Sequence, residues 1–273
     1  MKITKVESVA VDRFLFAKIH TDEGITGLGE TFLGVGPVEA HFHEIIAPYL
    51  LGKDPSLIEH HFQWLYRSSH FMGSVVQGAL SAIDIALWDI KGKRLNVPVY
   101  ELLSGKTRDK VRCYMHVVGE SVDDLVKDAK AKVSDGFTAI RFSPYKSDFY
   151  KHKSFSGWAE ESVNRVAAVR ESIGNDIDIC IEIHRQMSPA ESISLGKRLE
   201  PFFPFFYEDP MLPDSPAIMS EIQAQCNIPI ATGERLSTKY EFAKVIEKKA
   251  ASIIQFNLGR VGGILEAKKI SAI

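Results

Sequence analysis

Three glutamates stand where predicted strands end, each one strand-helix repeat after the last. Glu182 lies near the end of "IDICIEIH", Glu208 in "PFFYEDP" and Glu234 in "IPIATGE", so successive glutamates are 26 residues apart. If these strands are parallel neighbours, their carboxyl ends meet at one edge of the sheet. Three carboxylates held close together need a cation to stay ionised. Oxygen ligands of this kind favour Mg²⁺, with Mn²⁺ as the alternative.

A histidine accompanies the first of these carboxylates. Isoleucines alternate with polar residues over 177–184, which predicts a strand that puts Glu182 and His184 on one face and Arg185 on the other. His184 would then reach whatever the metal holds. Taken singly, a strand-end glutamate is often a helix cap and a strand-end histidine is often structural. The metal hypothesis therefore depends on the three glutamates occurring together.

The hydrophobic pattern after residue 108 predicts the elements that must position these residues. Short apolar runs alternate with helix-like segments, which predicts parallel βα units. The pattern indicates a (β/α)8-type TIM barrel, truncated after about six strands. A barrel lacking two strands has open edges, so we expect the sequence to be a piece of a longer protein rather than a truncated product. The predicted strands are 110–118, 137–144, 177–184, 204–210, 228–234 and 251–257.

The first 105 residues have a different character. Residues 1–30 contain short apolar runs with a hairpin turn signal at Asp22-Glu23-Gly24, which predicts a small antiparallel sheet. Three segments with apolar residues every three to four positions follow, and they predict helices at 37–52, 56–68 and 75–95. Strands first and helices second predict an α+β unit.

Composition narrows the class of partner. The chain has 273 residues, 45% of them hydrophobic, and a formal net charge of −2. Without a basic run, nucleic acid is not an expected partner. The N-terminus mixes charges into its apolar residues, so we expect neither a signal peptide nor a membrane span. Three widely spaced cysteines are typical of a reducing cytoplasm.

The order Glu182, Glu208, Glu234 on successive strands resembles the enolase superfamily. The segments "TDEGITGLGET" and "SAIDIALWDIKGKRLNVPVYELLSG" resemble its capping domain, and the run 178–236 is similar to acid-sugar dehydratases of the mannonate and galactonate type. These belong to the mandelate racemase-like branch. The resemblance implies an α+β capping domain over residues 1–105 and a partial barrel over 106–273 that carries the metal site.

The resemblance also implies a reaction. Such enzymes are Mg²⁺-dependent carbon–oxygen lyases (hydro-lyases). They remove the proton α to the carboxylate of an aldonic acid through an enediolate and expel the 3-hydroxyl, giving a 2-keto-3-deoxy acid. By the same resemblance, Glu182, Glu208 and Glu234 bind the metal, His184 is the general acid and Arg141, which closes "AIRF", acts on the substrate. The expected partners are a small acid sugar and further copies of the chain, with no membrane.

Other residues near the strand ends receive supporting roles. Asp209 and Arg235 stand next to predicted ligands and would orient them. Tyr145 or Tyr150 corresponds to a region where some mannonate-type enzymes place their base. The two glycine-containing loops of the predicted capping domain, residues 32–37 and 67–74, would read substrate shape.

The sequence departs from the resemblance in two places. Asn257 stands where galactonate-type members carry an aspartate that partners the base histidine, and an asparagine does not stabilise an imidazolium as a carboxylate does. The seventh strand, which would carry that histidine, is not in these 273 residues, and a chain lacking it would be inactive. Two alternatives therefore stay open: a racemase or epimerase of an α-hydroxy acid, and an inactive remnant that binds metal or acid sugar. "GRVGG" at 259–263 is interpreted as a tight turn rather than a phosphate site.

Overall fold

A computed structural model of the chain describes residues 1–145 and 154–273. The described residues form two compact units. The first contains residues 1–109, 234–243 and 256–273, and the second contains residues 110–233 and 244–255. Neither unit is continuous in sequence. The last 18 residues, for example, cluster with the N-terminal residues.

The first unit contains the predicted antiparallel sheet. Strands β1 (Ile3–Val11), β2 (Phe14–Thr21) and β3 (Thr26–Phe32) pair in sequence order. Every second residue of β2 from Leu15 to Thr21 is buried, as the alternation of side chains in a half-buried strand requires. The prediction of a small sheet at the N-terminus is confirmed.

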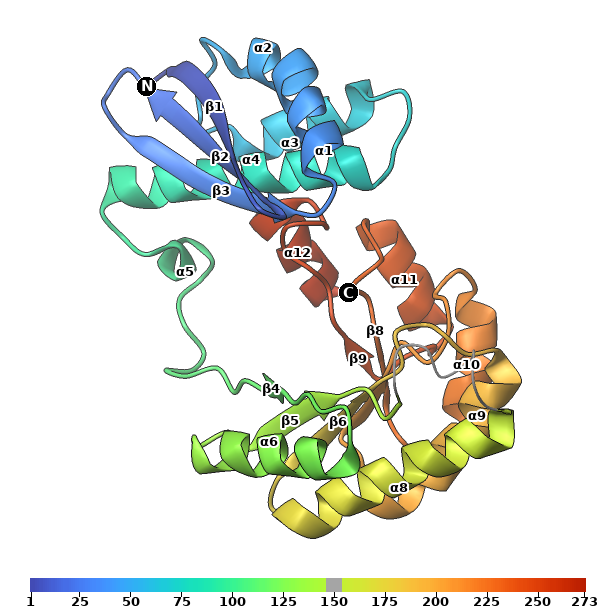
Figure 1. Ribbon diagram of the computed structural model, residues 1–273. Coiled ribbons are helices and arrows are strands. Elements are labelled where there is room, and N and C mark those ends of the chain that lie inside the picture. Colours follow the sequence, from blue (N-terminus) through green and yellow to red (C-terminus); the bar gives the residue numbers. More distant parts are fainter. Residues whose placement is uncertain (146–153) are drawn as a thin grey trace. The chain divides into compact units, whose positions relative to one another are not determined.

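A long helix, α4 (Ser74–Leu95), packs on β3 (Figure 1). Glycines in β3 make this close approach possible, since a Cβ at Gly29 would lie 1.8 Å from the carbonyl oxygen of Ala82. Buried apolar side chains of the sheet and of α4 form one continuous core. The unit also contains α1 (Val35–His41), a π-helical turn (Phe42–Ile46), α2 (Ala47–Leu50), α3 (Ile58–Ser68), α5 (Val99–Leu102) and α12 (Gly263–Ala272).

The second unit contains a parallel sheet of six strands within the described residues, in the order β4-β5-β6-β7-β8-β9. The strands are shorter than the apolar runs that predicted them, but each run contains one, so the alternation of strands and helices is confirmed. They are β4 (Met115–His116), β5 (Ala139–Phe142), β6 (Asp178–Glu182), β7 (Phe206–Glu208), β8 (Ile230–Thr232) and β9 (Ile253–Ile254).

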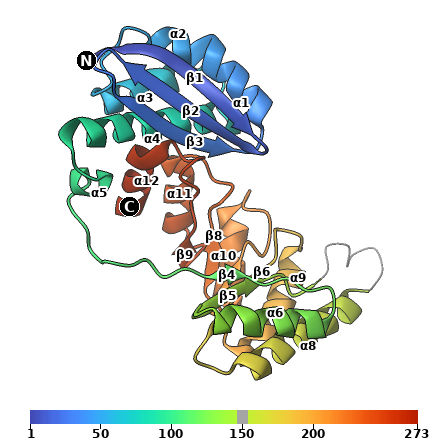
Figure 2. The same ribbon diagram turned by 60° about the vertical axis from the view of Figure 1, so that its left-hand side comes forward.

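Helices connect these strands and pack side by side, α6 on α8, α8 on α9 and α9 on α10 (Figure 2). Local sequence explains where two of them begin. Ser121 and Ser188 each accept a hydrogen bond from a backbone amide three residues later, and an acidic side chain at that position bonds back. These reciprocal bonds satisfy amides that a helix start leaves unpaired. The helices are α6 (Val122–Ser134), α8 (Phe155–Ile173), α9 (Pro189–Leu199), a 3₁₀ turn (Glu200–Phe202), α10 (Pro216–Gln225) and α11 (Lys239–Glu247), whose residues are divided between the units.

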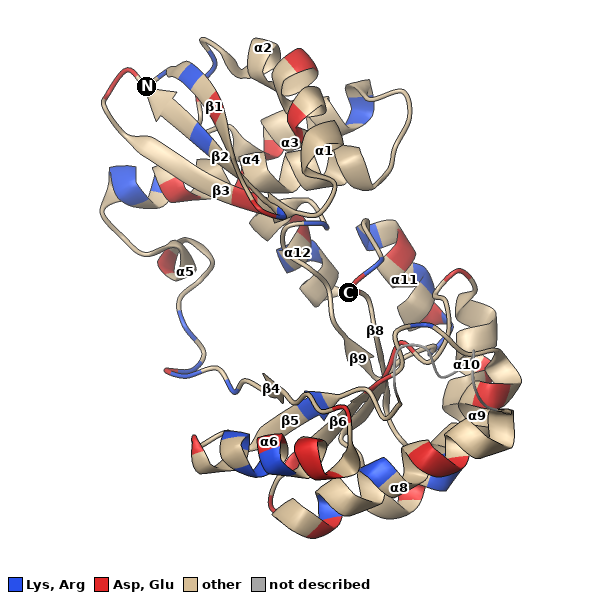
Figure 3. Ribbon diagram, viewed as in Figure 1, with Lys and Arg blue, Asp and Glu red and all other residues tan. Residues whose placement is uncertain are grey.

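Charged residues of both signs are mixed along helices such as α6 and α8 (Figure 3). Within residues 1–145 and 154–273, no helix has both the length and the apolar character needed to cross a bilayer. All three cysteines are free, and Cys180 and Cys226 are buried.

Candidate active site

Two of the predicted metal ligands lie side by side at the carboxyl end of the parallel sheet. Glu182 ends β6, Glu208 ends β7, and the register pairs them directly across the two strands. Arg141 lies on β5, opposite Cys180 of β6. All three charged side chains are buried, with no more than 7% of each residue exposed. The neighbouring strand ends therefore hold two carboxylates and one guanidinium away from solvent.

The guanidinium of Arg141 joins the two carboxylates. Its Nε lies 2.6 Å from Oε2 of Glu208, and Nη2 forms an ion pair with Oε2 of Glu182. Its Nη1 lies 2.9 Å from Nε2 of His116, in β4. Burial, and to a lesser degree the charge of Arg141, lower the pKa of His116. A neutral His116 can accept the hydrogen bond from Arg141. The guanidinium of Arg141 therefore has three partners, the carboxylates of Glu182 and Glu208 and the imidazole of His116.

His184 lies close to Glu182, but not for the reason that alternation predicted. The prediction of a strand through residue 184 is wrong, because β6 ends at Glu182 and His184 and Arg185 have φ values of 53° and 66°. This left-handed turn brings the backbone amide of His184 to 2.6 Å from Oε1 of Glu182. The imidazole is exposed, with Nε2 3.9 Å from Oε2 of Glu182 and Nδ1 3.4 Å from Oγ of Ser143.

Asp209 joins this turn to the next strands. It is buried, and its Oδ1 accepts a hydrogen bond of 2.6 Å from the hydroxyl of Thr232 on β8. Its Oδ2 accepts from Nη1 of Arg185 at 2.9 Å, and the backbone amide of Arg185 donates to the Asp209 carbonyl at 2.8 Å. The orienting role proposed for Asp209 thus has contacts that could perform it. The contribution of Arg185 was missed, because the turn reverses the direction that a regular strand predicts.

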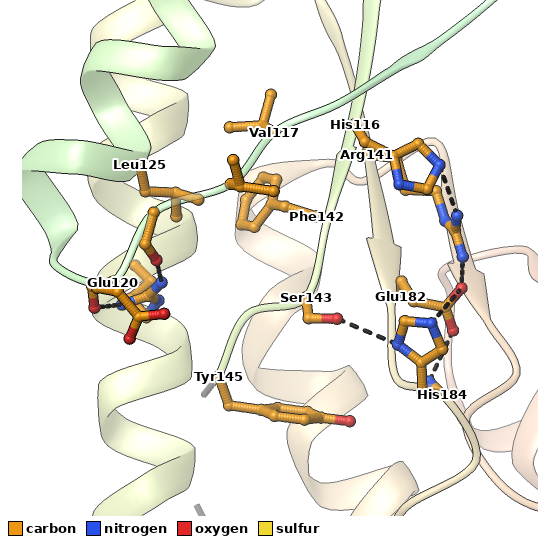
Figure 4. Close-up of a pocket in the computed structure, with 13 residues that line it drawn as sticks. His116, Val117, Glu120, Leu125, Arg141, Phe142, Ser143, Tyr145, Glu182 and His184 are labelled. Carbon is orange, nitrogen blue, oxygen red and sulfur yellow. Dashed lines mark hydrogen bonds and ion pairs between the residues drawn. The ribbon is translucent and has the colours of Figure 1, made fainter. Parts of the chain in front are cut away.

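A cavity of about 500 Å³ adjoins these residues. His116, Arg141, Ser143, Glu182 and His184 line one part of it, and Figure 4 shows the His184 ring between Ser143 and Glu182. His116 and Ser143 were not among the predicted site residues. Both stand near the ends of predicted strands, 110–118 and 137–144, and that placement was the available signal for them. The remaining lining residues are Val117, Val118, Gly119, Glu120, Leu125, Phe142, Tyr145 and Arg165.

Tyr145 is buried in the wall of the cavity. Its hydroxyl donates a short hydrogen bond to the carbonyl of Ile183, and burial raises its pKa well above the ordinary value of 10. A phenol in this state is a poor base near neutral pH. Its contacts instead support the backbone next to His184. Tyr150 lies outside the described residues.

The buried carboxylate pair offers, on adjacent strands, the oxygen ligands that a hard divalent cation prefers. In this structure the guanidinium of Arg141 lies beside Oε2 of both carboxylates. Among the residues that the structure describes, no three His, Cys, Asp or Glu side chains are arranged to hold a metal ion. Glu234 and Arg235 follow β8 and are exposed, and both belong to the first unit by contact.

Asn257 also belongs to the first unit. Its Oδ1 accepts a hydrogen bond of 3.0 Å from the backbone amide of Gly259. The side chain therefore stabilises the turn that begins the "GRVGG" segment.

Two family models match the chain. "Mandelate racemase / muconate lactonizing enzyme, N-terminal domain" matches residues 2–104, and "Enolase C-terminal domain-like" matches residues 124–273. Among curated proteins, a D-galactonate dehydratase from Ralstonia pickettii (strain 12J) is 38% identical over 277 residues, which cover 100% of this chain and 72% of that protein.

Solved structures agree with these matches. An enolase of the mandelate racemase subgroup from Agrobacterium tumefaciens has a TM-score of 0.91 and 34% identity, over 100% of this chain and 75% of its own. An enolase from Agrobacterium radiobacter, a proposed galactarate dehydratase with Na and L-malate bound, has a TM-score of 0.91 and 30% identity, over 100% of this chain and 71% of its own.

Proposed function

We propose that this chain, which belongs to the mandelate racemase/muconate lactonizing enzyme family of the enolase superfamily, acts as a Mg²⁺-dependent dehydratase of an acid sugar. The observation that carries the proposal is the buried pair Glu182–Glu208, bridged by Arg141, with the exposed imidazole of His184 beside it on a cavity. The similarity to a D-galactonate dehydratase supports the reaction type.

The proposed substrate is an aldonic acid. In the proposed reaction a general base accepts the proton α to its carboxylate, and the 3-hydroxyl is protonated and leaves as water. The α proton is only weakly acidic. A magnesium ion held by Glu182 and Glu208 would supply the positive charge that stabilises the enediolate, as in enolase-superfamily sites generally.

Elimination of the 3-hydroxyl needs a group that gives the leaving oxygen a proton. The His184 imidazole is suited to this because it is exposed and lines the cavity, and imidazole groups commonly serve as general acids. Arg141 also lines the cavity, and its guanidinium could bind a negatively charged substrate oxygen. Asp209 and Arg185 would keep the turn that carries His184 in place.

The acid sugar, a cytoplasmic location and assembly with further copies of the chain are parts of the same proposal. Free cysteines are compatible with a reducing compartment. Acidic and basic residues are mixed along the helices in Figure 3, and this mixture gives no support to a nucleic-acid partner.

A panel of aldonates, including gluconate, galactonate and mannonate, tests the reaction. The protein is incubated with each acid and Mg²⁺ in D₂O, and NMR follows both formation of a 2-keto-3-deoxy acid and exchange of the α proton. His184→Asn should lower turnover by about 10² to 10⁴-fold, while Mg²⁺ affinity measured by calorimetry stays unchanged. His60→Asn, at an exposed histidine of α3 in the other unit, is the matched control.

The outcomes separate the candidates. Exchange of the α proton without a keto product would indicate a racemase or epimerase on the same site. Mg²⁺ and acid-sugar binding with neither exchange nor product would indicate a remnant. Turnover that survives His184→Asn at the rate of His60→Asn would refute the role given to His184.

A further inference from the structure

We infer that Arg260 is a positioning residue that ties together two loops of the first unit, residues 32–37 and 67–74. These loops are expected to contact the substrate, so the inference rests on the proposed function. Arg260 belongs to the "GRVGG" segment, to which neither the predicted metal site nor the proposed reaction gives a role.

The guanidinium of Arg260 donates to backbone carbonyls of both loops. Its Nη2 forms short hydrogen bonds with the carbonyl oxygens of Phe32 and Leu33, at the start of the first loop. Its Nη1 donates to the carbonyl oxygen of Ser74, at the end of the second loop, at 3.2 Å. One side chain thus joins segments about 40 residues apart, which the chain connects only through α1 to α3.

The first loop presents its carbonyls through an unusual backbone. Leu33 and Gly34 have φ values of 60° and 64°, and two consecutive left-handed residues turn the chain sharply at the end of β3. A leucine in this region is strained unless neighbouring contacts stabilise it. The bonds from Arg260 to the carbonyls of Phe32 and Leu33 supply such contacts, and Cζ of the guanidinium also lies 5.4 Å from the Phe32 ring centroid.

The surroundings of Arg260 are shaped to hold it. A Cβ added to Gly78 of α4 would lie 3.0 Å from Nη1 of Arg260, so the glycine leaves the room that the guanidinium occupies. The preceding residue is also tied to the sheet, because the hydroxyl of Thr31 donates to the carbonyl of Gly259 at 2.7 Å. Burial lowers the pKa of Arg260, yet a guanidinium in proteins stays charged. Arg260 is partly buried and its guanidinium donates hydrogen bonds to the loop carbonyls, which indicates that it fixes the conformation of both loops.

Hydrogen exchange measured by mass spectrometry tests the inference in the whole protein. Arg260→Met should raise the exchange rate of amides in residues 33–37 and 69–77 by about tenfold or more, and Arg260→Lys should give a smaller rise because it keeps one donor group. Gly78→Ala keeps the arginine and crowds it, and should loosen the same two segments. Arg94→Met removes an exposed arginine at the far end of α4 and is the matched control.

Kinetics on the best aldonate of the panel supplies the second measurement. If the two loops contact the substrate, Arg260→Met should raise KM about tenfold and change kcat far less, because the interaction that is lost contributes to substrate binding. If Arg260→Met exchanges like Arg94→Met, the inference is overturned. It is also overturned if both loops loosen and KM stays at the wild-type value. If the loops loosen but the wild type turns over no aldonate, the tie by Arg260 stands and the proposed function fails.

Discussion

Replacing Arg141 by methionine should make the protein's stability depend on Mg²⁺. Arg141 forms ion pairs with two buried carboxylates, those of Glu182 and Glu208. Methionine keeps much of the side-chain volume and removes the charge, so both carboxylates lose this cation while they stay buried. Breaking a buried ion pair by removing one partner costs about 3–5 kcal/mol.

The two ion pairs share one guanidinium, so their contributions are coupled and do not simply add. A loss of about 4 kcal/mol in the free energy of unfolding is therefore expected rather than twice that figure. For a chain of this size it corresponds to a fall of about 10 °C in the unfolding temperature. The same carboxylates should then accept a divalent ion more readily, because no guanidinium has to leave them.

Mg²⁺ that binds the folded protein at these carboxylates should restore stability, by an amount that grows as RT ln(1 + [Mg²⁺]/Kd). At about 100 times its Kd, a ligand that binds only the folded state contributes about 2.7 kcal/mol. Differential scanning fluorimetry over a Mg²⁺ titration, with EDTA as the starting point, should give a larger rise for Arg141→Met than for the wild type.

Arg165→Met is the matched control for this experiment. Arg165 is also a buried arginine of the second unit, but its guanidinium donates to the carbonyls of Gly119 and Glu120. This variant should be destabilised without any added response to Mg²⁺. If both variants respond alike, or if Arg141→Met unfolds within about 1 kcal/mol of the wild type, the charge balance assigned to Arg141 is wrong.

Four further substitutions, one of them a control, test other parts of the structure. Burial raises the pKa of Asp84 in α4 from its ordinary 3.8 to about 7, so the folded state binds the proton more tightly than the unfolded chain does. The wild-type free energy of unfolding should therefore fall relative to Asp84→Asn as pH rises from 4 to 8, by an amount on the order of 4 kcal/mol, measured by urea unfolding at each pH. Gly263→Ala would put a Cβ 2.4 Å from Oδ2 of Asp84 and should cost about 2–4 kcal/mol, whereas Gly24→Ala, with nearly the same φ and open space, should cost about 1 kcal/mol in the same unfolding assay. Tyr145→Phe loses the hydrogen bond to the carbonyl of Ile183 and should lower the free energy of unfolding by about 1 kcal/mol. The pH profile of turnover should keep its shape in this variant, whereas turnover would be lost if Tyr145 were the base.

The sequence predicted the order of the elements well because hydrophobic periodicity is a local signal. The apolar runs that contain β4 to β9 were recognised, and so was the placement of Glu182 and Glu208 at neighbouring strand ends. The strand boundaries were less accurate, since an apolar run continues past the last ladder hydrogen bond. Residues such as Ile183 remain buried outside β6.

The side-chain network was not predictable in the same way. Arg141 on β5 contacts two carboxylates and His116, which lie on three other strands. No spacing of residues along the chain predicts these contacts. The turn at His184 and Arg185 has left-handed backbone at two residues that are neither glycine nor asparagine. Histidine is somewhat enriched at positive φ, but one such residue in an apolar alternation is a weak turn signal, so alternation was extended two residues too far.

This early end of β6 has a consequence for the proposed chemistry. Because the chain turns at His184, the two oxygens of Glu182 have different partners: Oε1 accepts from the His184 backbone amide, and Oε2 pairs with Arg141. A backbone amide keeps its place when a side chain moves, whereas a guanidinium on a flexible stem can withdraw. Replacement of the Arg141 guanidinium by a metal ion would therefore change the partner of Oε2 of Glu182. The hydrogen bond from the His184 amide to Oε1 would keep the carboxylate and the turn at His184 in place. Such an arrangement would let the site change its cation without rebuilding the strand end beside His184, the proposed general acid.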